Sequence, residues 1–141
     1  MKYILALDPD RGYAVVKDRR IIEAGTVKGI KELEEKIIVI SHLCRDAQQE
    51  LVVRIELSQT KRPYQRTERL PLAVRFKVQG DVGANREKAK SLGRLCVRLG
   101  LKYEFVEPCA IKPTKKQIES ITGYKGRTSE HSRDAIAIAW R

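Results

Sequence analysis

Four side chains that can bind a divalent cation stand at the ends of apolar segments of the chain. Asp8 follows ILAL, Glu56 ends the run LVVRI, and His131 and Asp134 come just before AIAIAW. A carboxylate beside apolar sequence is costly to bury unless a cation or a hydrogen-bond donor faces it. Brought together in the fold, these four residues would form a divalent-metal site.

Each of these residues also has an ordinary explanation. An Asp after a strand forms a turn or caps a helix at least as often as it binds a metal. His131 alone would more often be a surface histidine near a helix cap. Asp134 could form a salt bridge with Arg127 or Arg133. His131 and Asp134 are three residues apart and project from one face of a helix, so the set as a whole indicates a metal site.

The net charge is the unusual feature of the composition. The 141 residues predict a single domain over residues 1–141, with a core large enough to fold without disulfides. The formal charge of +11 favours a polyanionic partner, because a cationic surface releases counterions when it binds a phosphate backbone. A solubilising surface and a membrane-proximal patch are the alternatives, and the charge together with the carboxylates favours nucleic acid.

The cysteines and the N-terminus predict a cytoplasmic protein. Cys44, Cys96 and Cys109 form no Cys-x-x-Cys pair and no zinc-binding spacing. An odd number of cysteines without a disulfide framework is typical of a reducing compartment. The apolar run at the N-terminus is too short for a signal peptide, and no segment is long enough to cross a membrane, so no membrane partner is expected.

The apolar pattern predicts strands and helices that alternate along most of the chain. The expected strands are Tyr3–Leu7, Gly12–Lys17, Arg20–Val27, Leu51–Glu56 and Lys102–Val106, and the expected helices are Ile30–Gln49, Ala84–Leu99, Lys115–Ile121 and a last helix, capped by Thr128 or Ser129, that ends at Trp140. Leu57–Gly80 contains two prolines and no clean period, which predicts a loop with room for one short helix.

This order predicts an α/β fold with a mixed five-stranded sheet and helices on both faces. The first three strands are joined by short turns and should be antiparallel, and the two that follow helices should be parallel. Ligands bind at the carboxyl ends of parallel strands. If the first and fourth strands are neighbours, Asp8 and Glu56 lie at one edge of the sheet, close enough to share a metal ion.

Taken together, the motifs resemble the RuvC-type Holliday junction resolvases of the RNase H-like nuclease superfamily, especially the short bacteriophage members. The resemblance covers nearly the whole chain. It rests on ILALDPD followed by GYAVV, the strand that ends at Glu56, the helix Asn85–Leu99, the segment VEPCAIK that ends at Lys112, and the most specific part, the ending HSRDAIAIAW.

The resemblance implies an RNase H-like fold and a metal-dependent endodeoxyribonuclease. In that family two Mg²⁺ or Mn²⁺ ions bind between four side chains, which correspond here to Asp8, Glu56, His131 and Asp134. His131 could instead orient the water without binding metal. Lys112 resembles a lysine near the scissile phosphate. The family acts on four-way DNA junctions by paired symmetric cleavage, which implies a homodimer, formed through the helix Asn85–Leu99.

Three positions depart from the family pattern. The family usually has Gly where this chain has Asp10, which adds a carboxylate near the site. It often has an aromatic residue soon after the glutamate, where this chain has Gln59. The helical pair is often two acids, and His131 is the variant form. These differences bear on substrate selectivity more than on the metal site.

A basic segment with aromatic residues follows Glu56. Cations with aromatics among them suit a surface that follows phosphates and stacks on an unpaired base. The resemblance implies an aromatic wedge at the junction centre, for which Tyr64 is the first candidate and Phe76 the second. Tyr64 could instead anchor a loop, and Phe76 would more often be a core residue. The predicted DNA-binding residues are Lys61, Arg62, Tyr64, Arg66, Arg69, Arg75, Lys77, Lys115, Lys116, Lys125 and Arg127.

Two other functions are compatible with the same residues. A nuclease of the same superfamily could act on other branched or single-stranded nucleic acid. The fold could also serve as a non-catalytic junction-binding module. Cleavage of a four-way junction, compared with a linear duplex, discriminates among the three.

Overall fold

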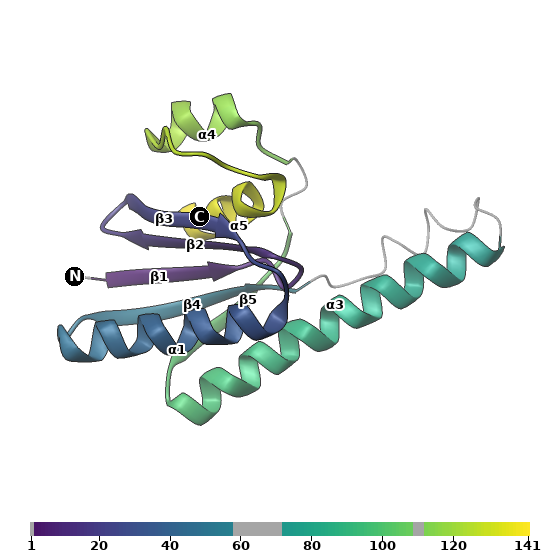
Figure 1. The fold of residues 1–141 in the computed structure, drawn as a ribbon, viewed down its shortest axis with the longest axis horizontal. Coiled ribbons are helices and arrows are strands. Elements are labelled where there is room, and N and C mark those ends of the chain that lie inside the picture. The colour runs from purple at the N-terminus through teal and green to yellow at the C-terminus, as the bar shows by residue number, and fades with distance from the viewer. Residues whose placement is uncertain (1, 58–71, 109–111) are drawn as a thin grey trace.

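A five-stranded mixed sheet forms the centre of the molecule (Figure 1). The computed structural model describes residues 2–57, 72–108 and 112–141, and of residues 72–83 only the backbone. The strands are β1 (Lys2–Leu7), β2 (Gly12–Lys17), β3 (Arg20–Thr26), β4 (Glu50–Glu56) and β5 (Lys102–Val106), in the order β3-β2-β1-β4-β5.

The strand directions confirm the predicted mixed sheet. β2 is antiparallel to both β1 and β3, whereas β4 is parallel to both β1 and β5. Asp18 and Arg19 form the two-residue turn between β2 and β3, and both have positive φ angles. A turn of this hand matches the right-handed twist of the two strands, so the predicted tight hairpin is confirmed.

The described helices cover both faces of the sheet, as predicted. In Figure 1, α1 (Ile30–Asp46) and α3 (Leu72–Leu99) lie on one side, and α4 (Lys115–Thr122) and α5 (Glu130–Trp140) on the other. Each face has its own apolar core. None of the helices described combines the length and the apolar content needed to span a bilayer.

Small residues let α5 lie close to the sheet. Ala6, Ala14 and Ala24 are paired neighbours across β1, β2 and β3, and all three belong to the core on the α5 side. Ala135 and Ala139 of α5 are buried in the same core. Larger side chains at these positions would hold the helix further out, so this alanine row sets the depth at which α5 docks.

The first turn of α5 is stabilised by capping hydrogen bonds, and it lies close to β2 because Gly12 has no side chain. Ser129 is the N-cap, and its side chain and that of Ser132 form a capping box. The Ser129 hydroxyl also hydrogen bonds to Thr26 of β3. A Cβ atom at Gly12 would overlap the backbone carbonyl of His131, so β2 and α5 can be this close only with glycine at that position.

Two arginines hold the last turn of α5. The guanidinium of Arg54, on β4, donates to the carbonyl oxygens of Ile138 (3.1 Å), Ala139 (3.2 Å) and Arg141 (2.9 Å). Arg19, in the hairpin turn, donates to the carbonyl oxygen of Trp140 at 3.2 Å. Cations at a helix C-terminus satisfy its unpaired carbonyls and its dipole.

Two helix boundaries differ from those predicted. α1 ends at Asp46 rather than Gln49, because Gln48 has a positive φ angle and the amide of Gln49 donates to the carbonyl of Cys44. α3 begins at Leu72, so the loop predicted through residue 80 is wrong for residues 72–80. No proline follows Pro71 within this helix, and glycines inside it cost only about 1 kcal/mol each.

The leucine stripe of the predicted helix Ala84–Leu99 lies in the core of this chain. Leu92 is fully buried, Leu95 is 8% exposed and Leu99 is partly buried against the same cluster. Cys44 and Cys96 are buried in the same cluster. The leucine stripe therefore serves core packing within this chain.

Replacing Gly12 by alanine should loosen the contact between β2 and α5. The new methyl group would collide with backbone, which cannot rotate away, so we expect the free energy of unfolding to fall by about 2–3 kcal/mol. Gly29→Ala is the control, since nothing lies within 4 Å of a Cβ there and the backbone is extended. Urea unfolding measures both, and equal effects would contradict the close approach of α5.

Candidate functional site

The parallel pairing of β1 and β4 brings Asp8 and Glu56 to one edge of the sheet. Leu7 pairs with Ile55, and each acidic residue is the next one along the chain. Asp8 is 7% exposed, and the pKa of Glu56 responds to its charge. The condition that the sequence left open, that the first and fourth strands are neighbours, is thus met.

His131 of α5 lies between two carboxylates. Its Nδ1 atom is 3.1 Å from Oδ2 of Asp8, and its Nε2 atom is 3.6 Å from Oδ2 of Asp10. The other oxygen of Asp8 accepts a hydrogen bond from the amide of Asp10 at 3.1 Å. Both ring nitrogens therefore face an acid, and in this arrangement the imidazole orients the Asp8 carboxylate.

Lys112 faces Asp134. Its Nζ atom is 3.3 Å from Oδ2 of Asp134 and 3.2 Å from Oε1 of Glu130. The side chain of Asp134 is only 13% exposed, so the ammonium group supplies the positive partner that a largely buried carboxylate needs. The alternative partners, Arg127 and Arg133, are not the ones found, and Arg133 hydrogen bonds instead to the preceding loop.

Like charges converge on Glu56. Burial, followed by the negative charges of Asp8 and Asp134, raises the pKa of the Glu56 carboxyl from its ordinary 4.5 to about 7. The positive charges of Lys112 and Arg141 act in the opposite direction but are weaker. Burial also raises the pKa of Asp8, although the amide of Asp10 and the ring of His131 partly offset it. The five predicted catalytic residues are therefore brought into one electrostatically coupled cluster.

The donors fit a hard divalent cation, but they are engaged with one another. Among the residues that the structure describes, no three His, Cys, Asp or Glu side chains are already positioned as ligands of one ion. Asp8 is paired with His131, and Asp134 with Lys112. Three carboxylates and an imidazole are nevertheless a donor set that Mg²⁺ or Mn²⁺ accepts, and a cation would relieve the repulsion that raises the pKa of Glu56.

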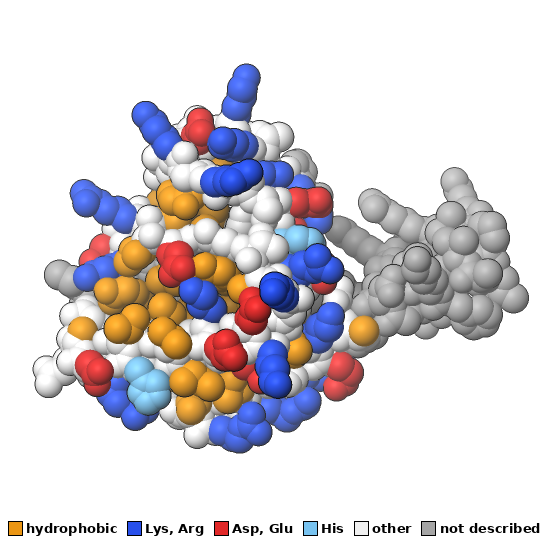
Figure 2. Space-filling view, viewed as in Figure 1, with side chains coloured by type: hydrophobic (Ala, Val, Ile, Leu, Met, Phe, Trp, Pro, Cys, Tyr) orange, Lys and Arg blue, Asp and Glu red, His pale blue; other side chains and the backbone are white. Residues whose placement is uncertain are grey.

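The predicted DNA-binding residues divide into two groups. Those described are exposed on or beside α4, where Figure 2 shows Lys and Arg side chains standing out from the surface; they are Lys115, Lys116, Lys125 and Arg127. The others lie outside the described residues or have no described side chain; they are Lys61, Arg62, Tyr64, Arg66, Arg69, Arg75 and Lys77, together with Gln59, Phe76 and Cys109.

Three residues of the site region were not predicted from the sequence. Gly12 allows the start of α5 to lie against β2. The position of this glycine, four residues after Asp8 and at the start of a strand, was the sequence signal that could have indicated the close contact. Glu130 shares Lys112 with Asp134. Arg54 interrupts an otherwise apolar strand two residues before Glu56, which marked it as a residue with a buried partner.

Comparisons with protein-family models, with curated proteins and with solved structures found no significant match to this chain.

Glu56→Gln should make the protein more stable above neutral pH. Because the pKa of Glu56 is raised in the folded state, folding disfavours its charged form, and stability is lost as the pH rises from about 4.5 to about 7. The amide removes that cost. Urea unfolding at about pH 5 and about pH 8 should show a smaller loss for the variant than for the wild type, and added Mg²⁺ should restore the wild type.

The control is Glu50→Gln, at the other end of the same strand. Glu50 is exposed and its pKa is lowered by Lys102, so its replacement should not protect the protein at high pH. If the two variants lose stability to the same extent between the two pH values, Glu56 is not under the repulsion described.

Proposed function

We propose that the protein is a metal-dependent endodeoxyribonuclease of RNase H-like fold that resolves four-way DNA junctions by paired symmetric cleavage. It would belong to the RuvC-type resolvases and act as a cytoplasmic homodimer. The mixed sheet, with three antiparallel strands followed by two parallel ones, is the arrangement that this family resemblance implies. The net charge of +11 supports a DNA substrate.

The observation that carries the proposal is the convergence of three carboxylates at one edge of the sheet. Asp8, Glu56 and Asp134 come from three elements far apart in the sequence, and burial and mutual repulsion raise the pKa of Glu56 to about 7. A protein that needed only stability would not gather these charges, because each raises the cost of the next. Perturbed carboxyl groups of this kind are typical of functional sites.

Asp8, Glu56 and Asp134 would hold the metal ions, with His131 as a fourth ligand or as the group that orients Asp8. Two bound divalent ions supply a nucleophilic water and stabilise the leaving oxygen of an in-line displacement. Lys112, which pairs with Asp134, would be placed to bind a phosphate oxygen of the substrate beside the metal ligands. The carboxylates alone would repel DNA, so metal and substrate binding are coupled.

A non-catalytic DNA-binding module is the second candidate. It is favoured by the partners that Asp8 and Asp134 already have, His131 and Lys112, which engage two of the three carboxylates without a metal. Such a protein would bind junctions with equal affinity in the presence and absence of Mg²⁺.

Asp8→Asn should abolish cleavage of a synthetic four-way junction in Mg²⁺ or Mn²⁺ while junction affinity is kept or increased. The amide cannot bind the cation, but it removes a negative charge that repels phosphate. Cleavage is followed on denaturing gels with a linear duplex of the same sequence, and affinity by fluorescence anisotropy in Ca²⁺. A loss of at least about 100-fold in cleavage rate is expected, about 2.7 kcal/mol of transition-state stabilisation.

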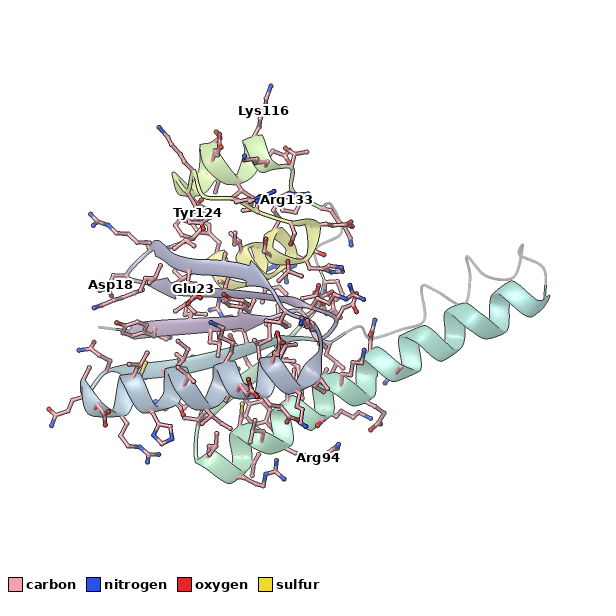
Figure 3. All side chains as sticks on the ribbon, in the orientation of Figure 1. Asp18, Glu23, Arg94, Lys116, Tyr124 and Arg133 are labelled. Carbon is pink, nitrogen blue, oxygen red and sulfur yellow. The ribbon has the colours of Figure 1, made fainter. Side chains whose placement is uncertain are left out.

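The control is Asp18→Asn in the hairpin turn, at the end of the sheet away from this site, as Figure 3 shows. Asn tolerates the positive φ angle there, so normal cleavage is expected. Paired nicks near the branch point support resolution, and indiscriminate cutting supports a nuclease with other substrates. Tight binding without cutting in either metal, or normal cutting by Asp8→Asn, would overturn the proposal.

A further inference from the structure

The excess positive charge is confined to three segments of the chain. Residues 58–71 contain four Lys and Arg and one Asp or Glu, residues 72–99 contain seven and two, and residues 112–128 contain five and one. The rest of the chain has 13 basic and 14 acidic residues. The largest share therefore belongs to α3, for which no DNA-binding role was predicted beyond its first turns.

The outer face of α3 carries a stripe of cations. Lys90, Arg94 and Arg98 are exposed and recur every four residues, which is about 6 Å along a helix. The opposite face, with Leu92 and Cys96, is buried against the sheet. Figure 3 shows Arg94 on the side of α3 that points away from the sheet. We call Lys90, Arg94 and Arg98 the α3 stripe.

The α3 stripe is not neutralised within the part of the chain that the structure describes. The side chains of Arg94 and Arg98 have no ion pair or hydrogen bond with any described residue, and that of Lys90 reaches only Glu87, at 4.0 Å. Like charges four residues apart destabilise a helix. By contrast, α1 mixes three basic with four acidic residues. A surface needed only for solubility would mix signs in the same way, so the stripe indicates an anionic partner.

We propose that the α3 stripe binds the sugar–phosphate backbone of duplex DNA. The inference rests on the DNA partner of the proposed function but not on cleavage. α3 begins beyond the edge of the sheet that carries Asp8. It then crosses the sheet to the opposite edge, where the chain continues into β5 (Figure 1). A duplex arm that leaves the candidate site along this helix would meet the stripe.

A dimer contact through this helix would have to form on its exposed face, because Leu92 and Leu95 are used in the core of the chain. That face carries Val97, which is 63% exposed, together with Arg94 and Arg98. Phosphates recur about every 3.4 Å of duplex axis on each strand, so a cationic stripe of this length can meet about three of them. Such contacts carry no sequence specificity.

The experiment measures how the affinity for a fluorescein-labelled linear duplex depends on salt. Arg94→Gln combined with Arg98→Gln should weaken binding several-fold and make the slope of log affinity against log salt shallower by roughly 2, about one for each lost phosphate contact. The control pair is Arg20→Gln with Lys28→Gln, exposed cations outside the three basic segments, which removes the same net charge. Thermal melting verifies that both folds are intact.

Equal slopes for the two pairs, or no duplex binding by the wild type, would overturn the α3 stripe as a DNA-binding surface. The proposal would also fail if the Arg94 and Arg98 variant bound duplex DNA as the wild type does and showed weaker binding only to vesicles that contain phosphatidylserine. Junction cleavage is measured separately at saturating protein. If the wild type does not cut but the slope changes as expected, the nuclease proposal fails and the DNA-binding surface stands.

Discussion

The repulsion among Asp8, Glu56 and Asp134 is the constraint on which the rest of the structure depends. Three acids reach one edge of the sheet only because β1 and β4 are parallel neighbours and because α5 is held above them. The helix is pinned at both ends, by Gly12 and the serine caps at its start and by Arg54 at its end. The free energy of that docking offsets the cost of bringing the charges together.

Charge is divided in space as well as along the chain. The sheet and the helices packed closest to the site carry nearly balanced charge, whereas α3 and the segment around α4 are strongly basic. A basic surface attracts a polyanion, and a cluster of acids beside it needs cations where the phosphate backbone meets the carboxylates. This division accounts for both the candidate site and the α3 stripe.

The position of His131 refines the chemistry of the site. An imidazole with one nitrogen toward Asp8 and the other toward Asp10 orients a carboxylate in the arrangement described. Asp10 contacts the Nε2 atom of His131, at a position where the family that the sequence resembles usually has glycine. Lys112 contacts the Asp134 carboxylate in a similar way. Two of the three carboxylates are thus already paired, Asp8 with His131 and Asp134 with Lys112, and an ion would have to replace these contacts with stronger ones.

The sequence by itself determined the elements and most of the site. Continuous apolar runs predicted every strand to within a residue at either end. Asp8 and Glu56 were noticed because each is an acid at the end of such a run, where burying its charge is costly. The length of α3, the burial of its leucines and the partner of Asp134 depended on tertiary structure. Only packing decides whether the helix starts before Gly80 and whether its leucine stripe is covered by this chain. Packing likewise decides whether Lys112 or an arginine is the cation nearest to Asp134. Periodicity specifies a face, but the sheet decides what lies against it.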